Sequence, residues 1–498
     1  MSGVRFNNWT GKLTDTGGNG MDKMFQLKKN GTSVRTEVVA GLTTFMTMAY
    51  IIALNPNILV GFDKQGTPLW NGVFLATCIA SAIGTICMAF LANKPFVMAP
   101  GMGLNSFFAI VVANIATITG MTALQSFQSA LVIVFVEGIV FIVLSLLNIR
   151  EKIVEAIPLG VRLGIGPAIG LMLMNIGFGT NVQVSGADKD GNQGMFLAMR
   201  DFFGSLTAKA AKDTIGTGYN LMILTVVTMF IGLFAIIALN HKKIKGAVLY
   251  GMLIASAIYW AGQAIFFDTD PFASLRSASF VPPFQDMADT TLFRLNFDGF
   301  MEIGWFTIIT LIITFCIIDM FDTIGTLVGT ASRAKMLDDK GKMPKMKEAL
   351  LSDAIGTVAG SVTGTSTVTT FVESASGVEA GGRTGLTALV AGFMFLLCMF
   401  FAPVAAVIPP AATSSALIYV GILMLGNLKE IKFDDISQLA PVAIMLLAMP
   451  ISGSIGHGIG LALISYTAIK LSTGKARDVS WLTYVLSVIF ILKFFIAV

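Results

Sequence analysis

Long apolar stretches separated by short polar segments run through nearly the whole chain. A helix that spans a lipid bilayer needs about 20 mostly apolar residues, and by that measure we expect about fourteen membrane segments. They are predicted at residues 37–59, 71–92, 96–115, 123–148, 159–178, 219–240, 246–267, 303–330, 349–363, 368–380, 385–408, 411–427, 438–471 and 481–497.

Some of these runs are interrupted by glycine, proline and polar residues. The first clear case is 96–108 (FVMAPGMGLNSFF), and the second is 364–385 (GTSTVTTFVESASGVEAGGRTG). The run 438–471 is too long for one helix, and Pro450 with three nearby glycines should break it. Interrupted segments at corresponding places in two halves of a chain point to a transporter binding site. We therefore expect segments 3 and 10 to build a site near the middle of the membrane.

The two halves of the chain also resemble each other in sequence. Residues 157–175 begin Ile-Pro and end Leu-Met-Leu-Met-Asn, and residues 408–427 begin Ile-Pro and end Leu-Met-Leu-Gly-Asn. Chance similarity between apolar segments is the alternative explanation, but one interrupted segment in each half favours a true repeat. Seven segments per half is an odd number, so the two repeats should have inverted orientations in the membrane.

The composition supports an all-α polytopic membrane protein. Charged residues make up 12% of the chain and hydrophobic residues 55%, whereas average soluble proteins carry about 25% charged residues. This balance excludes a soluble enzyme, a nucleic-acid-binding protein and a disordered chain. The four cysteines lie in apolar runs without CxxC spacing, so we expect neither a disulfide framework nor a metal site, and no cofactor.

Lysine and arginine gather in alternate loops. Cytoplasmic loops carry an excess of these residues, so this side is predicted to be cytoplasmic and to hold the N-terminus, in the plasma membrane. The opposite loop at 267–302 is acid-rich, and 180–218 is expected to be a loose polar loop on that outer side. The basic residues are Lys28, Lys29 and Arg35, then Arg150, Lys152 and Arg162, then Lys242, Lys243 and Lys245, and then Arg333, Lys335, Lys340, Lys342, Lys345 and Lys347.

Acidic residues inside apolar segments are the first candidates for a functional site. Asp319 and Asp322 lie three residues apart in the run 311–329 and should share one helix face. Like charges that close favour protonation of one of the pair, and the hydroxyl of Thr323 is nearby. Glu373 follows a β-branched stretch that could be extended. Its alternative role is a carboxylate stabilised at a helix N-terminus.

Three further polar residues have two interpretations each. Asn105 follows the Pro100–Gly101 break, and its amide both donates and accepts, which suits a planar heterocycle. The alternative is a glycine kink with an asparagine cap. Asp353 could cap a helix or support Asp319. Glu137 is expected to be a structural hydrogen-bonding residue.

Several motifs resemble those of the AzgA-like branch of the nucleobase–cation symporters, which contains adenine, guanine and hypoxanthine permeases. The resemblance covers nearly the whole chain. In the sister branch of uracil, xanthine and ascorbate transporters, a Gln/Glu-Asn motif ends in Thr-Arg-Gly. Here Glu373 is followed by Ser374 and the end reads Arg-Thr-Gly, which favours the purine branch. The motifs are TTFMTMAYIIALNPNIL at 43–59, MAPGMGLNSFFA at 98–109, DMFDTIGTLVG at 319–329, TFVESASGVEAGGRTGLTALVAG at 370–392 and MPISGSIGHGIGLALISY at 449–466.

This resemblance implies a uracil-permease-like fold of seven plus seven inverted segments, with segments 3 and 10 broken by short strands. It also implies a core domain that moves against a gate domain, and a possible homodimer through the gate. The corresponding divisions are a cytoplasmic tail at 1–35, core halves at 36–150 and 303–408, and gate halves at 151–302 and 409–498.

The implied activity is import of a purine nucleobase with a proton. Hypoxanthine and guanine are favoured, and an adenine-preferring permease is the alternative. The resemblance assigns substrate binding to Asp319, Glu373 and Asn105, and we group Thr323 and Ser374 with them. The proton would be carried by Glu373, Asp319, Asp322 or Asp353.

Rival classes fit the residues less well. A transporter of anions or of other nucleobases on the same fold remains an alternative, although an anion site should be cationic and this one is acidic. An intramembrane aspartyl protease would need Tyr-Asp and Gly-x-Gly-Asp, and the sequence contains neither. A channel would need a continuous polar stripe, whereas the polar residues cluster at two breaks. We therefore expect a transporter and not an enzyme.

Overall fold

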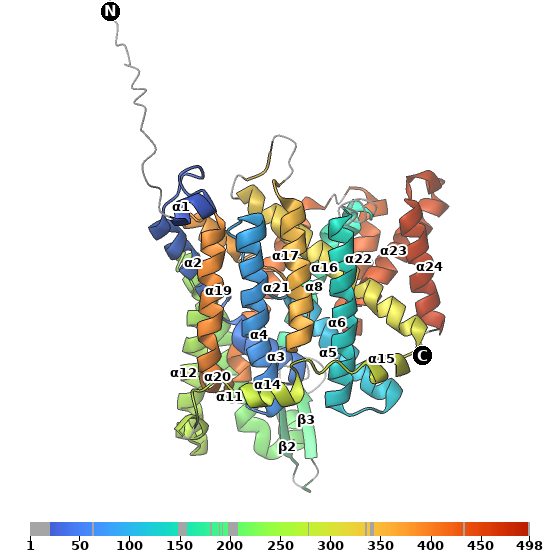
Figure 1. Cartoon of the computed structure of the whole chain (residues 1–498). Coiled ribbons are helices and arrows are strands. Elements are labelled where there is room, and N and C mark those ends of the chain that lie inside the picture. The colour runs from blue at the N-terminus through green and yellow to red at the C-terminus, as the bar shows by residue number, and fades with distance from the viewer. Residues whose placement is uncertain are drawn as a thin grey trace, which may run out of the picture.

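The computed structural model is a bundle of helices with a few short strands (Figure 1). It describes residues 20–61, 64–147, 157–179, 182–188, 190–191, 193–197, 208–276, 278–333, 336–338, 343–431 and 434–496. The predicted domain boundary at 150/151 and the basic residues Arg150, Lys152, Lys335, Lys340 and Lys342 lie outside these described residues.

The predicted polytopic helical fold is confirmed. Nine helices among the described residues are long and apolar enough to cross a membrane, and shorter apolar helices accompany them. Local capping explains several starts. Thr67 accepts a hydrogen bond from the Trp70 N–H and precedes a proline at the first helical position. Thr122 and Gln125 form a reciprocal capping box.

The first half of the chain contains both regular and interrupted segments. Its membrane elements are α2 (Val34–Met48), α3 (Ile51–Val60), α4 (Pro68–Cys87), β1 (Met98–Pro100), α5 (Met102–Thr119), α6 (Ala123–Leu146), α8 (Leu159–Phe178), α11 (Tyr219–His241) and α12 (Ala247–Phe267).

The second half mirrors this order and ends with three helices. Its elements are α16 (Trp305–Arg333), α17 (Met346–Thr363), β4 (Val368–Thr370), α18 (Ser374–Glu379), α19 (Gly385–Cys398), α20 (Ala402–Ala406), α21 (Pro410–Met424), α22 (Ile436–Ser452), α23 (Ile455–Ser472) and α24 (Trp481–Ile496). The predicted break in 438–471 lies at Gly453, whose φ of 61° ends α22 and lets α23 pack back against it.

Helices from both halves of the chain pack together in two groups. In one group, α17 packs on α4 and α6, and α19 packs on α2 and α4. In the other, α8 packs on α21 and α22, and α11 and α12 pack on α21. The first group carries both interrupted segments, so it positions the candidate site.

The two ends of the bundle differ (Figure 1). At one end lies α1 (Gly20–Phe25); Phe25 and, just beyond the helix, Leu27 are buried. The predicted polar tail at 1–35 is therefore partly packed onto the bundle from residue 20 onward. At the opposite end lie the helices α14 (Phe284–Thr290) and α15 (Phe297–Glu302) and an antiparallel hairpin of β2 (Gln183–Ala187) and β3 (Gln193–Leu197).

The hairpin corrects the expectation of a loose loop at 180–218. Within the described residues of that stretch, the hairpin is followed by α10 (Ala208–Ile215), which packs against both strands. Close backbone contacts explain why this stretch packs together. A Cβ added to Gly194 would lie only 2.5 Å from the carbonyl oxygen of Thr214. Polar composition alone did not reveal this packing.

Candidate functional site

The two interrupted segments meet as a short antiparallel pair of strands. β1 and β4 pair with Met98 opposite Thr370 and Pro100 opposite Val368. The pairing continues beyond the strands, because the Phe371 N–H donates to the Val97 carbonyl at 3.0 Å. Irregular backbone at membrane depth must be satisfied within the protein, and this ladder satisfies it. The predicted strand breaks in segments 3 and 10 are confirmed.

Gly101 allows the two strands and α16 to approach closely. A Cβ at this position would lie 2.6 Å from the Thr369 side chain and 3.3 Å from Oδ2 of Asp322. No side chain fits there without moving its neighbours. The glycine therefore brings the start of α5 next to one of the predicted acids.

The polar segment 365–370 is held by side chains from four surrounding helices. Each bond joins a hydroxyl of this segment to a different helix, namely α3, α5, α6 and α16. The pairs are Thr365–Asn55 at 2.8 Å, Ser366–Asn105, Thr367–Glu137 at 2.8 Å and Thr369–Thr323 at 2.7 Å. Glu137 thus has the hydrogen-bonding role expected of it, and Asn105 is tied to the strand crossing.

Thr323 connects two buried carboxylates. Its hydroxyl lies 3.0 Å from Oδ1 of Asp319 and 2.8 Å from Oδ1 of Asp353. All three residues are fully buried. Asp353 lies inside α17 rather than at its start, so the capping interpretation is wrong. The other interpretation, a residue associated with Asp319, agrees with this geometry.

Glu373 is held by a residue that sequence reasoning missed. The Tyr50 hydroxyl donates to Oε1 of Glu373 at 2.7 Å. The other carboxylate oxygen, Oε2, is buried and has no hydrogen-bond partner among the described residues. Glu373 stands at the N-terminal cap of α18, as its alternative interpretation also anticipated. A buried acceptor without a partner is costly, so Oε2 is the clearest position for a ligand donor.

The remaining predicted site residues are Ser374, Asn105 and Asp322. Ser374 is buried, and its Oγ accepts from the Val97 N–H at 2.9 Å. Asn105 donates to the Pro100 carbonyl at 3.3 Å. Both side chains therefore stabilise the strand crossing directly. Asp322 is partly buried and lies within electrostatic reach of Asp353 and Glu373.

Glu37 is a buried acid that sequence reasoning missed. It lies in α2 and is fully buried. Its carboxylate accepts hydrogen bonds from the backbone N–H groups of Arg383, Thr384 and Thr387 and, at 2.6 Å, from the Thr387 hydroxyl. It caps the N-terminus of α19 from another helix. Its position at the polar start of the first apolar run gave no signal of this role.

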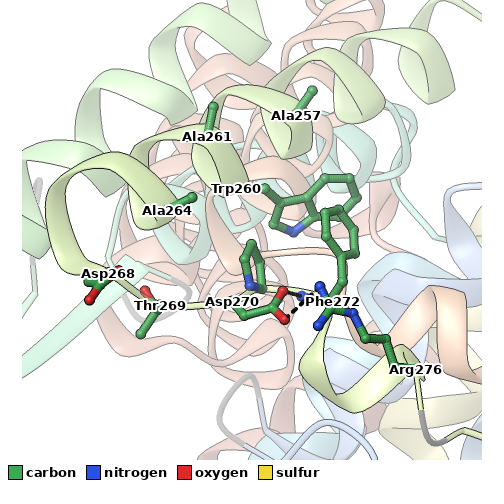
Figure 2. A pocket seen from close by; sticks show the side chains of 10 residues that line it. Ala257, Trp260, Ala261, Ala264, Asp268, Thr269, Asp270, Phe272 and Arg276 are labelled. Atoms are coloured by element: carbon green, nitrogen blue, oxygen red, sulfur yellow. Dashed lines mark hydrogen bonds and ion pairs between the residues drawn. The ribbon is translucent and has the colours of Figure 1, made fainter.

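A pocket of about 690 Å³ lies away from these residues, beside the end of α12. Figure 2 shows Trp260 and Phe272 against its wall and an ion pair between Asp270 and Arg276, whose atoms are 3.0 Å apart. Trp260 donates to the Val407 carbonyl, where α20 leads into α21. The pocket contains none of the predicted site residues.

A bundle with two interrupted segments that cross at a buried acidic site defines a membrane transporter. The profile described as "Permease family" (Xan_ur_permease) matches residues 35–459, and the chain belongs to this family. It is therefore a multi-pass membrane transporter.

Several relatives that match over nearly the full chain carry purine permease names. The adenine permease AdeP of Escherichia coli is 35% identical, over 96% of this chain and 97% of the relative. The guanine/hypoxanthine permease PbuO of Bacillus subtilis is 36% identical, over 95% of this chain and 100% of the relative. A putative permease of Methanocaldococcus jannaschii is 40% identical, over 95% and 98% respectively. The resemblance to the purine branch is confirmed.

Solved structures share the fold at low sequence identity. The transmembrane domain of the cyanobacterial bicarbonate transporter BicA superposes with a TM-score of 0.59 at 16% identity, covering 86% of this chain and 97% of that domain. The murine anion transporter Slc26a9 in its inward-facing state gives 0.54 at 11% identity, covering 93% and 74%. These similarities concern the fold alone.

Proposed function

We propose that the protein imports purine nucleobases together with protons across the plasma membrane. The observation that carries this proposal is the buried, unpartnered Oε2 of Glu373 beside the strand crossing. Purine bases present N–H donors along their edges, and a carboxylate accepts them strongly. The purine permease names of the relatives support the same substrate class.

Transport requires that the site become accessible from both sides of the membrane. We assign the helix group with both interrupted segments to the core halves at 36–150 and 303–408, and the group around α8 and α21 to the gate halves, because helices pack within each group. We propose that the core moves against the gate and carries Glu373 with it. The basic loops support a cytoplasmic N-terminus.

An anion substrate fits this site poorly, although the solved neighbours include anion transporters. Four acids, Asp319, Asp322, Asp353 and Glu373, lie at or near the crossing. An anion placed among them would meet like charge in a poorly solvated interior. The shared fold therefore does not extend the anion substrate to this chain.

Counting the hydrogens around Thr323 supports proton binding. A hydroxyl has one hydrogen to donate, yet the Thr323 oxygen lies within 3.0 Å of Asp319, Asp353 and Thr369. If Thr369 donates to Thr323, the two carboxylates must share the single Thr323 hydrogen or one of them receives none. A proton on Asp319 or Asp353 would supply the missing hydrogen, and we propose that this pair binds the transported proton.

Replacing Thr323 by valine tests this pair. We expect initial uptake to fall by about tenfold or more, because a bridge between two buried acids is lost. We also expect its dependence on external pH to change. Thr323→Ser keeps the hydroxyl and should retain most of the activity and the original pH profile. A valine variant with an unchanged rate and pH profile would exclude Thr323 and its two acids from proton coupling.

Uptake of radiolabelled hypoxanthine into proteoliposomes tests the proposed function itself. Under an imposed inward proton gradient, we expect accumulation that collapses with a protonophore. Unlabelled adenine and guanine should compete, and uracil should not. Folded protein that takes up no purine under this gradient would refute the assignment, and uptake that ignores the protonophore would refute proton coupling.

A further inference from the structure

The contact between Tyr50 and Glu373 bears on which purine the site prefers. Tyr50 is 1% exposed, and its phenol donates to Oε1 at 2.7 Å. It comes from α3's N-terminal cap, whereas Glu373 caps α18. The contact therefore joins the first and tenth segments and leaves Oε2 as the carboxylate oxygen without a partner.

Resting on the proposed function, we propose that Tyr50 is a specificity-determining residue that restricts Glu373 to a single N–H donor of the base. On its six-membered ring, hypoxanthine presents one such donor, N1–H, next to a C–H group. Guanine presents two adjacent donors on the same edge, N1–H and the exocyclic amine. A free carboxylate would bind that pair through both oxygens, as it binds paired donors elsewhere.

A competing role for Tyr50 would give the opposite preference. A phenol oxygen could itself accept the second guanine donor and so favour guanine. The Tyr50 hydroxyl is 2.7 Å from Oε1 and gives its only hydrogen to it, so we assign the phenol to Glu373 rather than to the base. This bond fills one acceptor position of Oε1 and fixes the orientation of the carboxylate, so the second bond that guanine could form is weakened.

Tyr50→Phe tests this inference with the loss of one oxygen atom. Competition against labelled hypoxanthine uptake gives the apparent affinities of guanine and hypoxanthine in the same vesicles. We expect the affinity ratio of guanine to hypoxanthine to rise about tenfold in the variant, which corresponds to about 1.4 kcal/mol. Tyr250→Phe removes a hydroxyl from an exposed position on α12 and should leave the ratio unchanged.

The outcomes separate this inference from the proposed function. Normal wild-type uptake with an unchanged ratio in Tyr50→Phe, or with a selective loss of guanine, overturns the specificity role alone. Absence of purine uptake by the wild type overturns both. A merely structural role of Tyr50 would weaken both bases equally and leave the ratio as it was.

A measurement on the wild type decides the matter even if Tyr50→Phe does not fold. Because Oε1 already accepts from Tyr50, the exocyclic amine of guanine gains little, so guanine and hypoxanthine should compete within about threefold of each other. A wild-type preference for guanine of about tenfold or more would show that Glu373 already binds paired donors, and the inference would then be wrong.

Discussion

Glu373→Gln is expected to reduce hypoxanthine uptake at low substrate concentration by roughly tenfold to a hundredfold. The amide has one acceptor oxygen instead of two, and Tyr50 already donates to one side of this group. If the amide oxygen stays with Tyr50, an NH2 group faces the N–H of the base. In either orientation the charge is lost, and hydrogen bonds to charged groups contribute about 1.5–3 kcal/mol each. Initial rates in proteoliposomes measure the effect.

Glu379→Gln is the matched control for this variant. Glu379 lies at the other end of the same short helix, α18, and is exposed. The same chemical change there should leave uptake near the wild-type level. A Glu373→Gln protein with wild-type affinity and unchanged pH dependence would remove Glu373 from both substrate binding and proton coupling.

Glu37→Ala is expected to have the largest effect on stability. The carboxylate satisfies three backbone N–H groups at the start of α19 and the Thr387 hydroxyl. Its loss leaves these buried donors without partners, at about 1–3 kcal/mol for each donor that water does not reach. We expect the free energy of unfolding to fall by about 3–5 kcal/mol. Thermal unfolding of the purified protein should begin roughly 5 °C lower or more.

Glu302→Ala serves as the control for the stability measurement. Glu302 is exposed at the end of α15, so its removal should leave the unfolding temperature unchanged. Purine binding protects only the folded state, and adding hypoxanthine should raise the unfolding temperature of both variants. Equal unfolding temperatures for Glu37→Ala and the wild type would show that the cap contributes little.

The sequence predicted where the membrane helices are interrupted but not what the interrupted segments contact. Glycine and proline near Pro100 and the Ser/Thr-rich stretch at 364–370 stand out against apolar runs, because such residues destabilise a continuous helix. The register that places Met98 opposite Thr370 depends on two distant segments meeting. Local patterns hold no information about such a pairing.

The same limit explains which site residues were found and which were missed. Asp319, Asp322 and Glu373 are conspicuous because ionised groups are rare in apolar runs. Tyr50 is an aromatic residue in an apolar run, and that pattern is typical of core packing. Only the folded structure reveals its bond to Glu373. Asp353 was noticed, but its connection to Asp319 passes through Thr323 and required the structure.

The strand crossing has a consequence for how the protein is made. Val97 and Ser374, which bond directly at the crossing, are 277 residues apart in the chain. At about 5–20 residues per second, a ribosome needs tens of seconds to synthesise that interval. During this time the Val97 carbonyl and the Gly101 N–H, which bond to Phe371 and Thr367 of the tenth segment, lack these partners, and in lipid each unpaired group costs several kcal/mol. We therefore expect that the third segment cannot settle in the bilayer until the tenth arrives, and that the first half expressed alone is degraded.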